Sequence, residues 1–250
     1  MSELDTHLES DYAEYINYTA HRTSIIDSGF ESDIKDLYRL LYIFSSNIYI
    51  YRDIDKKSFM WNYISETKND LIISFDLLNI NYMTASKRIL RSAIESFFRF
   101  SLCFARFDEY SQNKKAGIFQ ATEVLKQLKS MSDTHKVGKM TFYVSEYFQS
   151  TKIESQINKL YDKYSSLSSI VHVNSKTDFS PQRFLSQYAS IIEDDVRENV
   201  RTYKEIMLLI LLCLYYFETK LSESTFSKIT ILTIESIGGE EAKLFFDQCE

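Results

Sequence analysis

The sequence between residues 81 and 107 carries a set of arginines spaced for one side of a single helix. At 100° per residue, Arg88, Arg91, Arg99 and Arg106 fall on the same side, together with Glu95 and without any lysine. A guanidinium group presents a planar fork that can bind a carboxylate or a phosphate through two parallel hydrogen bonds. The four arginines are therefore candidate residues for binding an anion or an acidic protein surface.

The same residues also have a purely structural interpretation. Glu95 follows Arg91 by four positions, a spacing that predicts an ion pair on the helix surface. The remaining arginines could lie on a solvated face or pair with acidic residues of neighbouring helices, for which Glu193, Asp194 and Asp195 are one candidate cluster. The sequence leaves both interpretations open.

A second candidate group for chemistry is His172, at the end of a helical stretch that begins near Ile153. Tyr161, Ser165 and Ser168 follow one edge of this stretch toward the histidine. An imidazole beside hydroxyl groups can act as a general acid or base. A histidine at a helix C-terminus can equally cap the last carbonyl groups, where it suits the helix dipole. The candidate catalytic residues are accordingly His172, Arg91 and Glu95.

Long helices must position these groups. The side of 81–107 opposite the arginines is apolar and predicts a central amphipathic helix that faces a core, with Met83, Leu90, Ala93, Ile94, Phe97, Ser101 and Phe104. Further helices are predicted at about 2–26, 31–51, 57–78, 118–131, 153–172, 182–191, 194–221 and 226–237, with a short one after Gly238-Gly239. Region 132–150 is irregular and fits a loop or a short helix equally well.

Five glycines and one proline are few for 250 residues, which disfavours a fold with many tight turns. Hydrophobic residues make up 44% of the chain and aromatic residues 15%, enough to form a core. We therefore predict an all-α fold: one domain spanning 1–250, built as a bundle of about eight to ten helices. A weak seam, if the chain has one, is expected at 132–150.

The formal net charge of −6 argues against broad binding to DNA, which depends on many basic residues. The acidic start of the chain does not resemble a signal peptide. The most apolar run, 206–217, has twelve residues where a membrane helix needs about 20, and is expected to be a buried helix. The three cysteines show no metal-ligand spacing. A cytoplasmic protein without metal, cofactor or membrane partner is expected.

Two stretches resemble a known family. Residues 85–95, which contain Leu90-Arg91-Ser92 and Glu95, and residues 164–172, which read YSSLSSIVH, resemble bacterial helical proteins of the HEPN-like type. Active members cleave RNA without metal, using an arginine a few residues before a histidine, usually at a dimer interface. Here Ser165, Ser166 and Leu167 stand where that arginine would be. The resemblance implies a degenerate motif and a setting in bacterial anti-phage defence or a toxin–antitoxin system.

Two functions follow as hypotheses. The first is a non-catalytic helical interaction or accessory protein that binds a protein partner, in a hetero-complex or a homodimer. The second is a metal-independent ribonuclease in which His172 is the acid–base and Arg91, reaching it from another helix, stabilises the transition state. RNA is therefore a second candidate partner.

Overall fold

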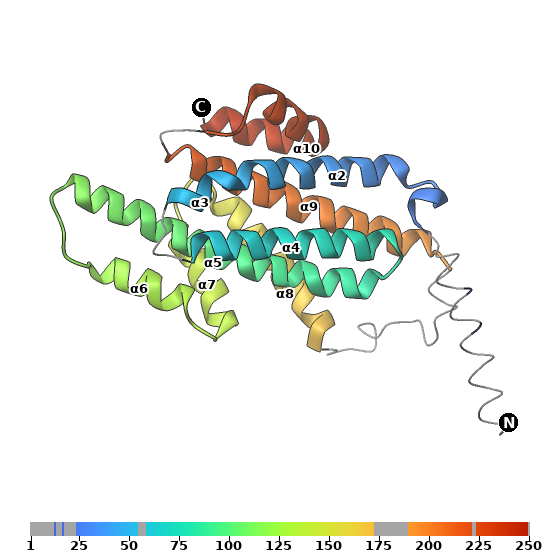
Figure 1. Ribbon diagram of the computed structural model, residues 1–250, viewed down its shortest axis with the longest axis horizontal. Coiled ribbons are helices and arrows are strands. Elements are labelled where there is room, and N and C mark those ends of the chain that lie inside the picture. Colours follow the sequence, from blue (N-terminus) through green and yellow to red (C-terminus); the bar gives the residue numbers. More distant parts are fainter. Residues whose placement is uncertain are drawn as a thin grey trace, which may run out of the picture.

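The computed structural model describes residues 13, 17, 24–54, 59–172, 190–221 and 224–249, with the backbone alone described at 170–172. Every regular element in these ranges is helical, which confirms the all-α prediction (Figure 1). The elements are η1 (Ile26–Ser28), α2 (Glu31–Asn47), η2 (Ile48–Ile50), α3 (Tyr51–Ile54), α4 (Met60–Asn79), α5 (Met83–Lys115), α6 (Glu123–Ser132), α7 (Val137–Tyr147), α8 (Glu154–His172), α9 (Glu193–Glu218) and α10 (Lys228–Cys249).

The central helix is α5, as the sequence predicts, and it contacts α4, α6, α7, α8 and α9. Its predicted apolar side is buried from Leu90 to Phe104. Residues on its other sides are buried too along the middle of the helix, among them Phe98 and Leu102. Other helices therefore surround α5 in this stretch, and the side that carries the arginines is covered rather than solvated.

The helices α4 and α5 form the most extensive pair in the fold, joined by a tight connection. The buried hydroxyl groups of Ser74 and Ser86 lie 2.9 Å apart across the pair, and each donates to the other residue's carbonyl oxygen. Two small side chains at the crossing let the backbones approach closely. The joint contains Asn81 at φ +65°, a left-handed conformation that asparagine tolerates better than most residues. The chain can therefore reverse direction within three residues.

The helix α9 confirms the prediction of a buried helix at 206–217, since nine of those twelve residues are buried. Tyr203, one turn earlier, is also fully buried and donates its hydroxyl to the carbonyl oxygen of Leu71 on α4 at 2.8 Å. At the other end, the Phe217 ring packs against rings of α5 and α7, with centroids 4.7 Å from Phe104 and 5.8 Å from Phe148. In the described part of the chain, no helix is both long and apolar enough to cross a membrane.

Some element boundaries differ from the sequence predictions. The helix predicted over 31–51 breaks into α2, η2 and α3, while the irregular region 132–150 contains α7, which packs on α5 and α8. The last apolar segment and the short helix after it join as α10, with a kink at Gly239, where φ is +68°. The predicted helices at 2–26 and 182–191 lie outside the described residues, apart from Ala13, Asn17, the last residues of the first and the end of the second.

The C-terminal part of α5 continues past the bundle and pairs with α6, so that the two helices project as a hairpin (Figure 1). The connection between them contains Phe119, which is 77% exposed, and ends at Thr122, whose hydroxyl accepts a hydrogen bond from the Leu125 amide at 3.3 Å. That N-cap fixes where α6 begins. The hairpin is thus an ordered projection that carries exposed aromatic surface.

Candidate functional site

Arg91, in the buried stretch of α5, binds two side chains of α8 and one of its own helix. Its Nε donates to Ser168 Oγ at 2.9 Å, and its Nη2 donates to Tyr164 Oη at 3.1 Å and lies 2.7 Å from Glu95 Oε1. The guanidinium carbon also lies 5.0 Å from the centre of the Tyr164 ring, within the range of a cation–π contact. The predicted pair with Glu95 is confirmed, and it belongs to a network that holds α5 against α8.

The four members of this network, Arg91, Glu95, Tyr164 and Ser168, are brought together by helical periodicity. Each pair is separated by four residues, so each lies on one face of its helix, and the two faces oppose each other. The Arg91 and Glu95 side chains are only 18% and 19% exposed. The guanidinium group is therefore occupied by internal partners in a mostly shielded position.

Burial disfavours the charged form of two carboxyl groups, Glu95 in this network and Asp70 beside it. Burial raises the pKa of Glu95, although Arg91, Arg99 and a hydrogen bond from Tyr164 lower it. Burial also raises the pKa of Asp70 on α4, opposed by a hydrogen bond from Ser92 and reinforced by the charges of Glu66 and Glu95. Asp70 Oδ2 has no hydrogen-bond partner among the described residues. Asp70 and Glu95 are therefore two shielded carboxyl groups on the facing helices α4 and α5, and the charge of Glu95 contributes to the raised pKa of Asp70.

Arg99, two turns after Arg91, closes the end of α6. Its Nη1 and Nη2 donate to the carbonyl oxygens of Ser132 and Thr134 at 2.5 Å and 2.9 Å. These carbonyls lie at and just beyond the C-terminus of α6, the negative end of its dipole, where a cation is favoured. Its guanidinium also lies 5.9 Å from the centre of the Tyr63 ring. Arg99 is therefore a structural residue that attaches α6 and the following loop to the bundle.

The other two arginines of the predicted set take no part in this network. Arg88 is exposed, and Arg106 is half-buried near the projecting hairpin; neither has a hydrogen bond or an ion pair among the described residues. None of the four arginines pairs with the acidic cluster at 193–195 in the described part of the chain, where Glu193 instead contacts Arg197. The four arginines thus share one helix but do not converge on one site.

His172 is the last residue of α8, one turn after Ser168, and its side chain lies outside the described residues. Of the hydroxyl residues that the sequence places along its edge, Ser168 binds Arg91, Tyr161 packs against the core and Ser165 is exposed. The prediction that the central helix crosses the segment leading to His172 is confirmed, because α5 contacts α8 through Arg91.

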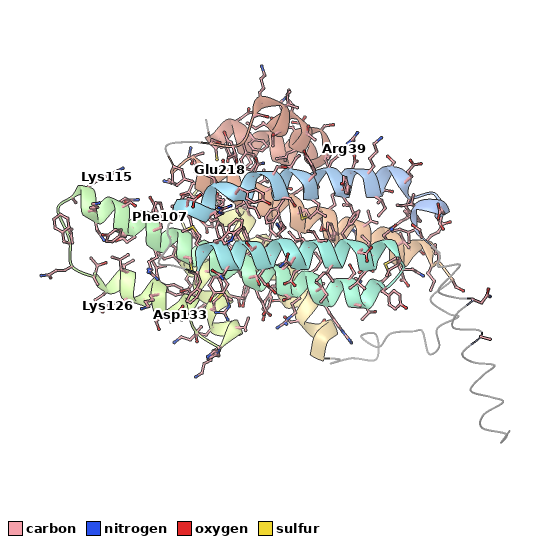
Figure 2. All side chains as sticks on the ribbon, in the orientation of Figure 1. Arg39, Phe107, Lys115, Lys126, Asp133 and Glu218 are labelled. Carbon is pink, nitrogen blue, oxygen red and sulfur yellow. The ribbon has the colours of Figure 1, made fainter. Side chains whose placement is uncertain are left out.

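A groove of about 820 Å³ lies along the projecting hairpin, and we call it the hairpin groove. Four basic side chains line it, two from α5 and two from α6: Arg106, Lys114, Lys126 and Lys129. Figure 2 shows Lys126 on α6 and Phe107 on α5, the two helices that form the groove. Asp53 at the end of α3 is its one carboxylate. The groove therefore has a basic character although the whole chain is acidic.

Apolar side chains share the lining of the hairpin groove. Phe107 and Tyr110 of α5, Leu125 of α6 and Phe119 of the connection all contribute. Tyr110 and Phe119 are 51% and 77% exposed. Aromatic and basic side chains on one concave surface are typical of sites that bind another macromolecule.

A smaller cavity of about 360 Å³ lies between α8, α9 and α10. Its apolar lining comes mainly from leucines of α9, and two ion pairs, Lys159 with Glu241 and Lys163 with Glu205, cross its edge. The two lysines of this cavity are paired with glutamates, and Asp162 is its remaining charged side chain.

The groove lysines and Asp70 are not among the residues predicted from the sequence. The sequence predicts that the central helix ends at Phe107. The helix continues for eight more residues, so Lys114 lies beyond the predicted end. Lys126 and Lys129 are three apart on α6, a spacing that places them on one face, and this signal was available. Asp70 has no such signal in the sequence, because a single carboxylate in a helical pattern does not indicate which residues pack against it.

No group of three metal-ligating side chains is close enough to hold a metal ion in the part of the chain that the structure describes. Comparisons with family models, with curated protein sequences and with solved structures found no match to this chain. The functional assignment therefore depends on the chemistry of the groove and of the arginine network.

Proposed function

We propose that this is a non-catalytic, cytoplasmic interaction protein that uses the hairpin groove to bind an acidic surface of a partner protein. The resemblance to HEPN-like bacterial proteins suggests its setting: an accessory subunit in an anti-phage defence or toxin–antitoxin system. In this proposal the bundle is a scaffold, and the projecting hairpin is the part that meets the partner.

The observation that carries the proposal is that some basic residues are bound to internal partners and others are not. Arg91 and Arg99 are committed to internal partners, whereas Arg106, Lys114 and Lys129 have no ion-pair partner among the described residues and share one groove. Lys126 pairs only with Glu123, at an exposed position where such pairs contribute little free energy. The groove therefore presents uncompensated positive charge beside exposed aromatic surface.

Charge complementarity of this kind accelerates association and selects acidic partners. Aromatic side chains bury large areas at interfaces and are strong contributors to binding free energy. The lysines would guide the partner, and Phe119 and Tyr110 would anchor it. This assignment requires no chemistry at Arg91 or His172.

The test is affinity purification from the native host with full-length protein as bait. Lys114→Glu combined with Lys129→Glu reverses two exposed groove charges without disturbing the core, and should reduce recovery of the partner at least about tenfold, since like charges facing each other are strongly unfavourable. Lys35→Glu with Lys139→Glu is the matched control, with the same change of net charge at exposed positions outside the groove. Equal recovery by both double variants would refute the proposal.

One observation favours the ribonuclease as a second candidate. Arg91 contacts α8 one turn before His172, so the arginine and histidine positions are neighbours on facing helices. In that mechanism His172 would move a proton and Arg91 would stabilise the charged transition state after leaving Glu95. Incubating the purified protein with RNA tests it directly. Cleavage that disappears in His172→Ala would support the ribonuclease, and intact RNA would remove it.

A further inference from the structure

The acidic N-terminal segment of the chain, residues 1–23, has the chemistry that the hairpin groove lacks. It contains five carboxylate side chains and a single arginine: Glu3, Asp5, Glu9, Asp11, Glu14 and Arg22. The groove contains four cations and the single carboxylate of Asp53. The chain therefore carries both halves of an electrostatically complementary pair.

The apolar residues of this segment also match the groove. Leu4, Leu8, Tyr12, Tyr15 and Ile16 recur at helical spacing. At 100° per residue, Glu9 and Asp11 flank this apolar stripe on its two sides, and Asp5 lies within it between Tyr12 and Ile16. Ala13 and Asn17, the residues of the segment that the structure describes, are helical and exposed. The pattern predicts an apolar stripe between two acidic edges.

The groove has the reciprocal arrangement. Arg106 and Lys114 approach from α5, Lys126 and Lys129 approach from α6, and apolar side chains of both helices line the same space. An amphipathic helix with acidic edges could place its apolar stripe on Phe107 and Leu125 while its edges meet cations from both helices. This is a match of pattern as well as of net charge.

Ser24, the residue that follows the segment, lies at the opposite end of the molecule from the groove. Its hydroxyl donates to Asn79 Oδ1 at 2.8 Å, and the Ile25 amide donates to the Asn79 carbonyl oxygen at 2.9 Å, at the α4–α5 joint. Figure 1 shows η1 at one end of the bundle and α6 at the other.

In its own molecule, the segment is too short to reach as a helix. From Met83 to Arg106 is about 35 Å along α5, and Lys114 is about 12 Å further. A helix that ended at Ser24 would carry its apolar stripe only about 12 to 30 Å from that residue. Its anchors would therefore stop short of the groove.

We infer that the acidic N-terminal segment docks in the hairpin groove of a second copy of the chain, so that two copies exchange segments about a two-fold axis. Antiparallel copies bring each segment to the other's groove, and the two identical contacts close the assembly. RNA fits the groove less well than this segment, because Leu125, Phe107 and Ala121 present apolar surface that suits the apolar stripe of the segment better than a sugar–phosphate backbone. The inference does not require the proposed function, but a partner protein and the segment would compete for the same groove.

The test is the molar mass of the full-length protein in low salt, by analytical ultracentrifugation over a range of concentrations. The wild type should approach twice the 29.5 kDa of one chain as concentration rises. Lys114→Glu with Lys129→Glu should remain monomeric, whereas Lys35→Glu with Lys139→Glu should dimerise as the wild type does. Added salt should weaken the dimer, because exposed charges are screened.

A charge exchange makes the test specific. Glu9→Lys, Asp11→Lys and Glu14→Lys together should abolish the dimer, and combining them with the two groove reversals should restore it. A wild type that stays monomeric at all concentrations would overturn the inference. Dimer formation by the Lys114→Glu with Lys129→Glu variant as strong as that of the wild type would overturn it too. A monomer whose groove instead binds a single-stranded RNA oligonucleotide, with the same dependence on Lys114 and Lys129, would also overturn it.

These results can be separated from those on the proposed function. The charge-exchanged chain regains its own dimer but presents an acidic groove, so it should still fail to recover an acidic partner. A wild type that stays monomeric but recovers its partner through the groove would refute the exchange of segments without contradicting the proposed function.

Discussion

Replacing Arg91 by methionine tests whether the arginine network is structural. Methionine keeps most of the aliphatic volume of arginine but removes the hydrogen bonds to Ser168 and Tyr164 and the ion pair with Glu95. The Glu95 carboxylate, only 19% exposed, then lacks its nearest cation. The expected result is a less stable protein that retains its fold.

The size of the loss follows from these contacts. A hydrogen bond that involves a charged group contributes about 1.5–3 kcal/mol, and removing one partner of a fully buried ion pair costs about 3–5 kcal/mol. Because the Arg91–Glu95 pair retains some exposure, a loss of about 2–3 kcal/mol is expected. For a chain of this size, each kcal/mol lowers Tm by about 2–4 °C. Arg91→Met should therefore lower Tm by about 5–10 °C.

Urea unfolding followed by far-UV circular dichroism measures this free energy directly. Arg88→Met is the matched control, because Arg88 is exposed and has no ion pair or hydrogen bond among the described residues, and it should change stability by less than about 0.5 kcal/mol. Adding Glu95→Gln to Arg91→Met should recover about 1 kcal/mol, since part of the penalty is the orphaned carboxylate. Equal effects of Arg91→Met and Arg88→Met would refute the structural role of the network.

Three further predictions concern the interior of the bundle. Burial holds the pKa of Asp70 above its usual value, so its ionised form destabilises the fold above that raised pKa. Asp70→Asn should therefore increase the free energy of unfolding by about 1 kcal/mol at neutral pH. Urea titrations should show this gain shrinking as pH falls through the folded-state pKa. Gly238→Ala would place a methyl group 2.8 Å from Ala242 Cβ and should lower the free energy of unfolding by about 1–3 kcal/mol. Gly138→Ala has open space around its Cβ position in α7 and should raise that free energy by about 0.5–1 kcal/mol. Thermal unfolding of both variants checks the difference. Among the cysteines, only the half-buried Cys249 should react with a thiol reagent in the folded protein, and all three should react in denaturant, as counted by mass spectrometry.

The fold was largely predictable because helical periodicity is strong in this chain. Segments such as 153–172 and 194–221 repeat apolar residues every three to four positions and contain almost no glycine or proline, so their observed bounds differ from the predictions by only a few residues. The prediction was weaker where packing decides the outcome. The amphipathic pattern of 137–147 is short, and α7 depends on burying Met140 and Val144 against the rest of the core.

The candidate site was only partly predictable. The Arg91–Glu95 pair is local and follows from a spacing of four residues. The contacts of Arg91 with Tyr164 and Ser168, and of Arg99 with the end of α6, join residues far apart in sequence and depend on how helices cross. A helical projection shows which residues share a face but not which helix covers that face. For this reason one stripe of arginines separated into two structural residues, one exposed residue and one groove residue.

In the proposed account, the hairpin groove binds the partner protein, whereas the arginine network stabilises the fold. The most direct test of this claim is the recovery of the host partner by two full-length baits, compared side by side at a temperature where both are folded. Lys114→Glu with Lys129→Glu should lose at least about tenfold in recovery with an unchanged Tm, whereas Arg91→Met with Glu95→Gln should keep wild-type recovery despite a lower Tm. The opposite pattern, with binding lost in the network variant and kept in the groove variant, would contradict the claim.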